Sequence, residues 1–314
     1  MINTKQILLH SGLFLFTLLT TTIAGVVWLN IDPFDLKNLT LGLPYSLSLL
    51  FILTCHEFGH YFAARYHGVN ATLPYYIPFP NFVIPYLYNP FGTMGAIIRT
   101  KSPIPSKKVL FDIGVAGPLA GFVATLIVLI YGFTHLPDQS FIISIHPNYF
   151  LETQQGPALK FGSSLLYNLF SAVLTDPANE FVPPMSEMYH YPFLCAGWFG
   201  LFVTAMNLIP VGQLDGGHIS YSMFGIKHRI LANASMIVLL GLGVADLLQY
   251  IGLPVSFGWL GWLIWAMLLV FVVKIYHPEI GDDTELDSTR KTVGWISFFI
   301  LVLSFTPSAL YEGF

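Results

Sequence analysis

The sequence is dominated by long apolar stretches from which charged residues are almost absent. A helix needs about 20 mostly apolar residues to cross a bilayer, and seven stretches approach or exceed this length. They lie at 7–29, 43–64, 109–133, 192–210, 230–251, 256–276 and 293–311. No small-residue cleavage pattern follows the first stretch, which favours a retained helix over a signal peptide. The pattern therefore predicts an all-α polytopic membrane protein, with residues 1–314 forming a single membrane-embedded domain.

The composition points to the same class of protein. Charged residues make up 10% of the chain and hydrophobic residues 54%, and the mean hydropathy is +0.67. A soluble globular domain carries about 25% charged residues. These values exclude a soluble domain, a disordered chain and a nucleic-acid binder, whose affinity would need clustered basic charge. The lipid bilayer is therefore the expected environment, and nucleic acid is not an expected partner.

The positions of Lys and Arg between these stretches predict the orientation in the membrane. With seven spans and a cytoplasmic N-terminus, eleven of the 13 basic residues fall on the cytoplasmic side, where such residues are enriched. They are Lys5, Arg65, Arg99, Lys101, Lys107, Lys108, Lys227, Arg229, Lys274, Arg290 and Lys291. Only Lys37 and Lys160 fall on the other side. The N-terminus is therefore expected in the cytoplasm and the C-terminus outside.

Two segments between the apolar stretches carry structural information. Residues 74–91 contain five prolines, and proline removes a backbone donor and clashes with the preceding helical turn. We therefore expect no helix here, but a small β or re-entrant hairpin folded against the membrane part at its cytoplasmic edge. The long segment 134–191 is expected to be an external loop, in which the apolar patch Leu165–Leu174 is a candidate lid or interfacial helix.

The clearest candidate for chemistry is the run His56-Glu57-Phe58-Gly59-His60 in the second apolar stretch. Residues four apart share one face of a helix, so both imidazoles can reach the same metal ion. Glu57 would lie beside that ion and could take a proton from a bound water. Neither His nor Glu belongs in a hydrocarbon layer without a partner. The run therefore predicts an intramembrane zinc site with Glu57 as catalytic base; the alternative is a chance run of polar residues at a helix end.

A catalytic zinc ion typically has three protein ligands and one open position for water. Away from the outer edges and the polar loops, the third ligand could come from Asp112, Asp215 or Asp246. Asp215 is favoured because it follows the end of the fourth stretch, which in the seven-span topology brings it to the same half of the membrane as the two histidines. Its neighbour His218 is a rival ligand, whereas Asp112 is expected to be a helix N-terminal partner and Asp246 a buried polar contact. The remaining histidines are expected to be interfacial rather than ligands: His10, His67, His135, His146, His190, His228 and His277.

Two motifs together resemble the site-2 protease family, the intramembrane zinc metalloproteases. One is HEFGH at 56–60, and the other is N-x-x-P-x-x-x-L-D-G, from Asn207 to Gly216. The run from Gly117 to Gly121 matches a small-residue motif of that family's core, where such spacing lets helices approach closely, and residues 92–98 are similar to members that lack a PDZ module. The resemblance covers about 43–217, the expected catalytic core. It implies zinc as cofactor, His56, His60 and Asp215 as its ligands, Glu57 as base, and Asn207 as a contact of the substrate backbone or the oxyanion.

The expected function is endoproteolysis within the membrane. The resemblance implies cleavage of transmembrane segments of single-pass membrane proteins, as in regulated intramembrane proteolysis, with the active site toward the cytoplasm. Such a segment must unwind locally, because the carbonyls of a helix are already hydrogen-bonded. The alternative is a metal-ion transporter or a catalytically inactive metal-binding scaffold, since intramembrane His and Asp also serve ion pathways. Glu57 favours the peptidase, because a simple transporter has no use for it.

A candidate substrate-binding segment follows the proline-rich run. Residues 92–97 are uncharged and include two glycines, at which another backbone could come close. They are Gly92, Thr93, Met94, Gly95, Ala96 and Ile97. An exposed strand edge could pair with an unwound substrate and replace its lost hydrogen bonds. The alternative is a turn that packs the loop against the core.

Overall fold

Helices make up most of the computed structural model, which describes every residue except 1–3, 81–90, 151–157, 254–256, 283 and 314. Four helical spans among the described residues are long and apolar enough to cross a membrane. They are α1 (Thr4–Trp28), α2 (Leu39–Tyr66, preceded by the short η1, Leu36–Asn38), α3 (Lys107–Thr134) and the span Asp215–Gln249, which joins α7 (Asp215–Phe224), η3 (Gly225–Lys227) and α8 (His228–Tyr250). The stretches predicted at 7–29, 43–64, 109–133 and 230–251 therefore do form helices of membrane-crossing length.

The other three predicted stretches also contain helices, but each of these is shorter than a full span. They are α6 (Pro192–Leu208), α9 (Gly261–Leu268, continued by the π-helical turn η4, Leu269–Val273) and α10 (Ser288–Ser304). The prediction of a helix as far as residue 311 is wrong. The helix ends at Ser304 and Leu310–Gly313 forms strand β4, because Pro307 between them lacks the backbone N–H that a continuing helix would need. Seven membrane crossings remain a prediction.

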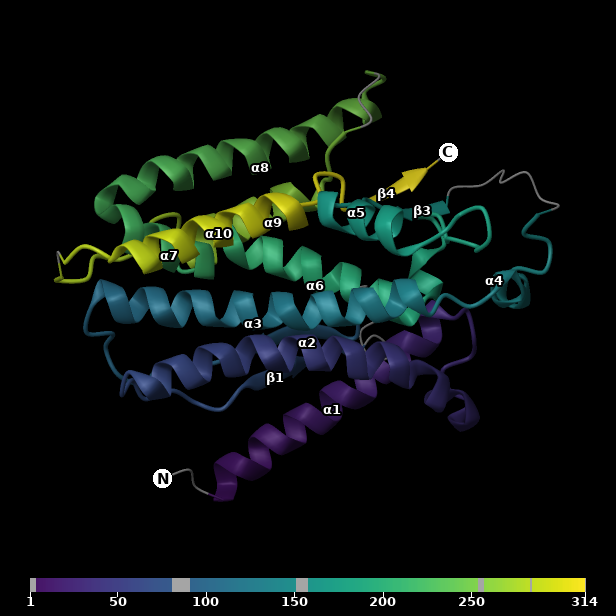
Figure 1. Cartoon of the computed structure of the whole chain (residues 1–314), viewed down its shortest axis with the longest axis horizontal. Helices are drawn as coiled ribbons and strands as arrows, with labels where there is room; N and C mark the ends of the chain where they lie inside the picture. Colours follow the sequence, from purple (N-terminus) through teal and green to yellow (C-terminus); the bar gives the residue numbers. More distant parts are fainter. Residues whose placement is uncertain (1–3, 81–90, 151–157, 254–256, 283, 314) are drawn as a thin grey trace.

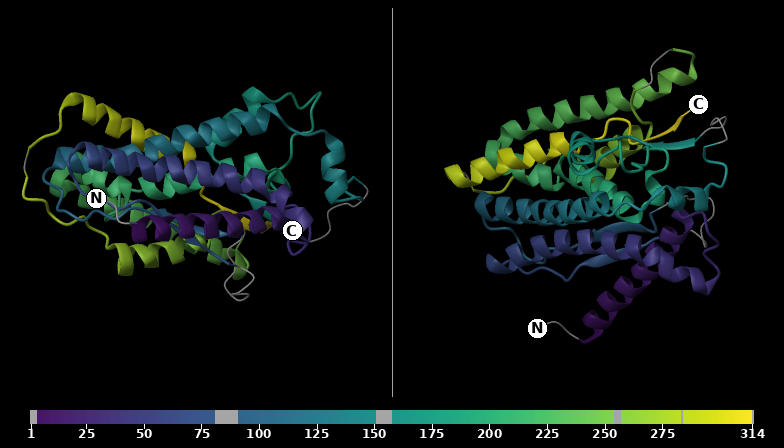
Figure 2. Two further views of the ribbon diagram at one scale, coloured as in Figure 1. Left: turned by 90° about the horizontal axis from the view of Figure 1, so that it is seen from below. Right: turned by 45° about the vertical axis from the view of Figure 1, so that its right-hand side comes forward.

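The long helices lie side by side in a layered bundle (Figure 1). α3 packs against both α2 and α6, α1 crosses α2 obliquely, and α8 covers the opposite edge, as the right-hand view of Figure 2 also shows. Close crossing of α1 and α2 depends on glycine. A β carbon added at Gly25 would lie 2.6 Å from the carbonyl oxygen of Gly42, so neither helix has room there for a side chain.

The described residues also form two small antiparallel sheets. β1 (Tyr75–Pro78) pairs with β2 (Thr93–Ile97), with an irregular register between Tyr76 and Pro78. The expected absence of a helix is therefore confirmed for the described part of 74–91, while residues 81–90 lie outside the described residues. β3 (Ala158–Phe161) pairs with β4 near the C-terminus, a pairing that the all-α prediction missed.

The long segment 134–191 contributes further helices at one end of the bundle. α4 (Gln139–Ile145) is capped by Asp138, and α5 (Leu165–Leu174) coincides with the predicted apolar patch. The short η2 (Met188–His190) then leads directly into α6. α4 lies at the end of the bundle remote from α7 (Figure 1).

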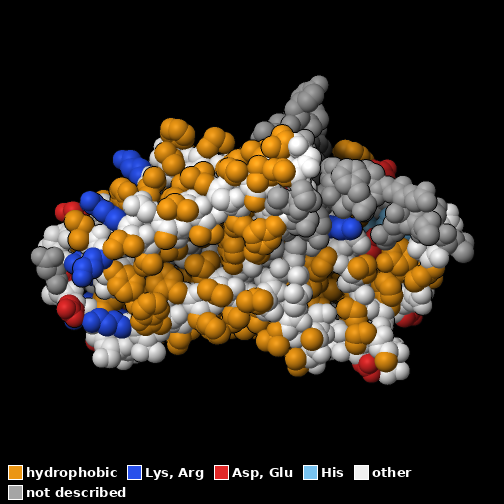
Figure 3. Space-filling model, turned by 90° about the horizontal axis from the view of Figure 1, so that it is seen from above, with side chains coloured by type: hydrophobic (Ala, Val, Ile, Leu, Met, Phe, Trp, Pro, Cys, Tyr) orange, Lys and Arg blue, Asp and Glu red, His pale blue; other side chains and the backbone are white. Residues whose placement is uncertain are grey.

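The surface has the character expected for a lipid environment. Hydrophobic side chains cover much of the face in Figure 3, whereas most of the visible Lys and Arg side chains gather at one end. Large apolar side chains are widely exposed on the long helices, including Leu8, Val123 and Ile237. A soluble monomer rarely exposes apolar area on this scale, so the surface supports an integral membrane protein.

Candidate metal centre

Two histidines of α2 face the interior of the bundle one helical turn apart. His56 and His60 are 6% and 7% exposed, and their Nε2 atoms are 3.1 Å apart. The four-residue spacing puts both rings on one face of the helix. Glu57, beside them on α2, is equally buried. The HEFGH run thus lies within a single helix, which continues beyond it to Tyr66.

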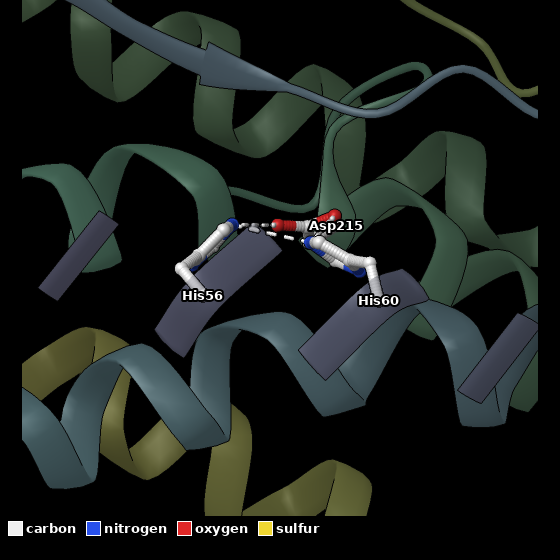
Figure 4. A group of neighbouring side chains, drawn as sticks. All are labelled: His56, His60 and Asp215. Atoms are coloured by element: carbon white, nitrogen blue, oxygen red, sulfur yellow. Dashed lines mark hydrogen bonds and ion pairs between the residues drawn. The ribbon is translucent and has the colours of Figure 1, made fainter. Parts of the chain in front are cut away.

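Asp215 approaches this pair from the other side, as the first residue of α7 (Figure 4). The chain turns sharply after α6 at Gly212, whose φ of +55° favours glycine. A β carbon at Gly216 would lie 2.0 Å from the carbonyl oxygen of the last residue of α6, so the turn needs glycine there too. The Asp215 carboxylate oxygens lie 3.4 Å from His56 Nε2 and 3.3 Å from His60 Nε2.

The three side chains converge closely enough to hold one ion. Ligand atoms about 2.0–2.1 Å from a tetrahedral zinc ion would be about 3.3 Å from one another. Here the two Nε2 atoms are 3.1 Å apart, Asp215 Oδ1 lies 3.3 Å from His60 Nε2 and Asp215 Oδ2 lies 3.4 Å from His56 Nε2. Two imidazoles and one carboxylate suit zinc and leave a fourth position open for water or substrate.

The orientation of His60 is fixed by the backbone of α3. Its Nδ1 lies 2.7 Å from the carbonyl oxygen of Ile113. A carbonyl can only accept, so Nδ1 carries the proton and the Nε2 lone pair points toward His56 and Asp215. Metal-binding histidines are commonly oriented in this way by a second hydrogen bond. Asn207 lies at the same group, with its side-chain nitrogen 3.3 Å from His56 Nε2.

The small-residue motif of α3 makes room for the two imidazoles. A β carbon at Gly117 would lie 2.1 Å from His60 Nε2, and one at Gly121 would lie 3.0 Å from the β carbon of His56. The expected close helix packing is also present, because a β carbon at Gly59 would lie 2.5 Å from a backbone oxygen of α3. The motif therefore serves the histidines as well as the helix contact.

A cavity of about 650 Å³ opens beside the converging side chains. Its wall includes Glu57 and Asn207 as well as the three residues of the group, together with the end of β2. The backbone amide of Ile98, just after β2, lies within hydrogen-bonding reach of the Glu57 carboxyl.

The six residues predicted to bind substrate occupy different surroundings. The cavity wall contains Ala96 and Ile97 but not Gly92, Thr93, Met94 or Gly95. Gly92 packs against α1, where a β carbon would lie 2.4 Å from a backbone oxygen. The buried hydroxyl of Thr93 donates to a carbonyl of β1 at 2.8 Å. The start of the segment, at Gly92 and Thr93, therefore packs against α1 and β1, and only its end reaches the cavity.

The other two aspartates have partners away from the group. Asp112 accepts two hydrogen bonds from Arg290, at 2.7 and 2.8 Å, and lies 2.9 Å from His67 Nε2. Asp112 is therefore an ion-pair residue within α3 rather than the expected partner of its N-terminus, which is capped by Ser106. Asp246 is 8% exposed and accepts from the backbone of α9's cap residue at 2.8 Å, which confirms the expected buried polar contact.

The rival ligand His218 turns toward another histidine. Its Nδ1 lies 2.8 Å from Nε2 of His277, and both rings line the cavity. Sequence reasoning assigned His277 to an interface and missed this contact. The chain around His277 lies beside the turn before α7, where the Gly212 N–H donates to the Ile275 carbonyl at 2.9 Å. No local sequence pattern reveals such a long-range contact.

Comparison with known proteins identifies a family. Residues 44–249 match the model of Peptidase family M50. The chain is similar to "Probable zinc metalloprotease EGY1, chloroplastic" of Arabidopsis thaliana, with 30% identity over 88% of this chain and 46% of that protein. It is also similar to the protein of the same name from Oryza sativa subsp. japonica (32% identity; 85% and 41% covered) and to "Probable zinc metalloprotease EGY2, chloroplastic" of Arabidopsis thaliana (29% identity; 93% and 47% covered).

The chain spans about half the length of the curated relatives it matches. The family match includes both motifs and the helices α2, α3, α6 and α7 that carry the converging side chains. The resemblance to the site-2 proteases is thereby confirmed, and the chain belongs to Peptidase family M50.

Proposed function

We propose that this chain is an intramembrane zinc endopeptidase that cleaves transmembrane segments of single-pass membrane proteins. The observation that carries the proposal is the convergence of His56, His60 and Asp215 at a cavity whose wall also contains Glu57. Membership of family M50 and the names of the relatives support the same activity.

The proposed mechanism assigns distinct tasks to the residues around the cavity. A zinc ion held by the three converging side chains would supply a Lewis acid for the water and the scissile carbonyl. Glu57 accepts a proton from the attacking water and returns it to the leaving amide nitrogen. The amide of Asn207, beside His56, offers a hydrogen bond to the carbonyl oxygen as negative charge develops.

The proposed orientation has seven spans, a cytoplasmic N-terminus and an active site toward the cytoplasm. Its support is the strong bias of Lys and Arg to one side of the predicted spans and their concentration at one end of the molecule in Figure 3. The converging group lies toward the same end, since α2 runs from His60 to Arg65 and α3 begins at Lys107. We propose a single membrane-embedded peptidase unit.

A metal-ion transporter or an inactive scaffold is the less favoured function. Glu57 lines the cavity without belonging to the converging group, which suits a proton acceptor better than a further ligand. The relatives are named as zinc metalloproteases, which also favours the peptidase.

Replacing Asp215 by Ala tests the proposed ligand set. The Asp215→Ala chain is expected to lose one equivalent of zinc relative to wild type and to lose cleavage, because two ligands remain of the three that such a site uses. Asp112→Ala and Asp246→Ala are the matched controls, since both acids have partners elsewhere. The measurement is the zinc content of each purified chain, with cleavage of transmembrane peptides in the same detergent. Unchanged zinc in Asp215→Ala would move the third ligand to another residue, with His218 the first candidate.

The outer edge of β2 is the proposed support for an unwound substrate. The N–H of Thr72 donates to the carbonyl of Arg99 at 2.9 Å. The backbone groups of Arg99 therefore point toward the chain that leads into β1. Backbone groups alternate along a strand, so those of Ile97 face the same way and those of Ala96 face away from β1. Among the described residues this outer edge pairs with no strand. The Ala96 amide, on the cavity wall, is therefore available to an extended peptide.

A proline at this position tests strand pairing with the substrate. Ala96→Pro removes one outward N–H while leaving the bonds between β1 and β2, and we expect cleavage to fall by roughly 10-fold, the effect of one lost hydrogen bond of about 1–1.5 kcal/mol. The control Ala96→Ser keeps the N–H and should cleave at a rate near wild type. Zinc content should be unchanged in both chains. Equal cleavage by the Pro and Ser variants would exclude pairing at this edge.

A further inference from the structure

A second group of metal-binding side chains lies at the other end of the bundle. His146 follows α4, while Glu187 and His190 lie at η2, just before α6. Asp215 follows the far end of α6, and the 17 residues of that helix correspond to about 25 Å. This outer cluster, His146, Glu187 and His190, is therefore separate from the proposed catalytic group and has no part in the proposed peptidase chemistry.

The geometry of the outer cluster closely matches that of the catalytic group. The two Nε2 atoms of His146 and His190 are 3.0 Å apart, and they lie 3.4 and 3.5 Å from Glu187 Oε2. The corresponding separations in the catalytic group are 3.1, 3.3 and 3.4 Å. In the outer cluster both imidazole nitrogens face the same carboxylate oxygen, whereas in the catalytic group they face different oxygens of Asp215. Each group thus offers two imidazoles and one carboxylate, at separations that suit a tetrahedral zinc ion.

Few N–H groups of the outer cluster point toward its centre. His190 Nδ1 lies 2.5 Å from the carbonyl oxygen of Trp28, so Nδ1 carries the proton and the neutral ring turns the Nε2 lone pair toward the cluster. His60 is oriented by the Ile113 carbonyl in the same way. Only His146 can then place a proton among the three inward atoms.

Glu187 is the residue that most needs a cation. It is 6% exposed, and its Oε2 has no hydrogen-bond donor among the described residues. A buried carboxylate without a donor or a counter-ion is costly. A divalent ion at the centre of the outer cluster would supply the missing partner to Glu187 and to both imidazoles at once.

We propose that His146, Glu187 and His190 form a second zinc-binding site, which ties the external segment to the membrane helices. The ligands come from the end of α4 and from η2, and Trp28, whose carbonyl orients His190, is the last residue of α1. Zinc is favoured over Ca²⁺ or Mg²⁺ because two imidazoles are poor ligands for those hard ions. His146 is the most exposed of the three, with 37% of its side chain accessible, so the fourth position can be filled by water.

The test uses the full chain with the catalytic group disabled. Purified Asp215→Ala protein is stripped with a chelator, reloaded with about 10 µM Zn²⁺, freed of unbound metal and analysed for zinc. We expect about one zinc per chain, bound by three protein ligands, and a reduction to near zero when Glu187→Gln or His146→Ala is added. Zinc should also raise the melting temperature of Asp215→Ala but not that of the double variants, because only a metal bound to the folded state stabilises it.

Two further double variants are the matched controls. Asp215→Ala with Glu180→Gln removes an exposed acid of the same segment, and Asp215→Ala with His135→Ala removes an exposed histidine at the end of α3. Both should retain the zinc of Asp215→Ala. His146 is partly exposed, so its replacement leaves the fold intact even if Glu187→Gln disturbs it. Absence of zinc from reloaded Asp215→Ala, or equal zinc with and without His146, would overturn the proposal.

Discussion

Replacing Glu57 by Gln is expected to abolish cleavage while zinc content stays at the wild-type value. Glutamine keeps the size of the side chain and an oxygen that can accept from the Ile98 amide, but it cannot take a proton from water. Loss of a general base typically costs about 10²–10⁴-fold in rate, so cleavage should fall at least about 100-fold. The rate is measured on transmembrane peptides that the wild-type chain cleaves, with zinc determined on the same samples.

The paired measurements separate the proposed functions. A peptidase requires Glu57 for chemistry but not for zinc binding, because the three converging side chains are His56, His60 and Asp215. Glu180→Gln is the control, since this acid is exposed on the segment 134–191. If Glu57→Gln cleaved as fast as the control, the proposed mechanism would be wrong. If the wild-type chain transported metal ions and cleaved no peptide, the result would instead favour the metal-ion transporter.

The convergence of His56, His60 and Asp215 could be predicted because two strong constraints act on it. The four-residue spacing fixes the two histidines on one face of a helix. The requirement that every span cross the bilayer then sets the depth and side of each motif. Few acidic residues are left that can reach the two histidines. Asp215 is predictable for this reason although 155 positions separate it from His60 (215 − 60).

The contacts that the sequence did not reveal lack such constraints. β3 pairs with β4 across about 150 residues, and both strands are short segments without a distinctive pattern. His146 and His190 come together only because the segment 134–191 folds back to α6, outside the long helices whose depth a bilayer would fix. No sequence pattern connects each glycine of α3 with a particular histidine, since helix packing alone explains the same spacing.

Replacing Gly117 by Ala is expected to remove the catalytic zinc. The added β carbon would lie 2.1 Å from Nε2 of His60 and 2.3 Å from its Cδ2, well inside any allowed contact. The ring cannot move aside without losing its hydrogen bond to the Ile113 carbonyl at 2.7 Å and its place beside Asp215. We therefore expect Gly117→Ala to lose one equivalent of zinc relative to wild type and to cleave at least about 100-fold more slowly, as expected when catalytic geometry is misplaced by about 1 Å.

Two other glycine variants turn this expectation into a graded test. Gly121→Ala brings its β carbon only to 3.0 Å from the His56 β carbon, so a shift of a few tenths of an ångström relieves it and the losses should be smaller. Gly241→Ala, in α8, meets no heavy atom of the described residues within 4 Å and should match wild type. Alanine is favoured over glycine in a helix by about 1 kcal/mol, so none of the three changes should weaken its own helix. The loss of zinc should therefore be largest in Gly117→Ala, smaller in Gly121→Ala and absent in Gly241→Ala, which would reflect the space available to the imidazoles. Full zinc in Gly117→Ala would show that His60 is not held as a ligand in this position.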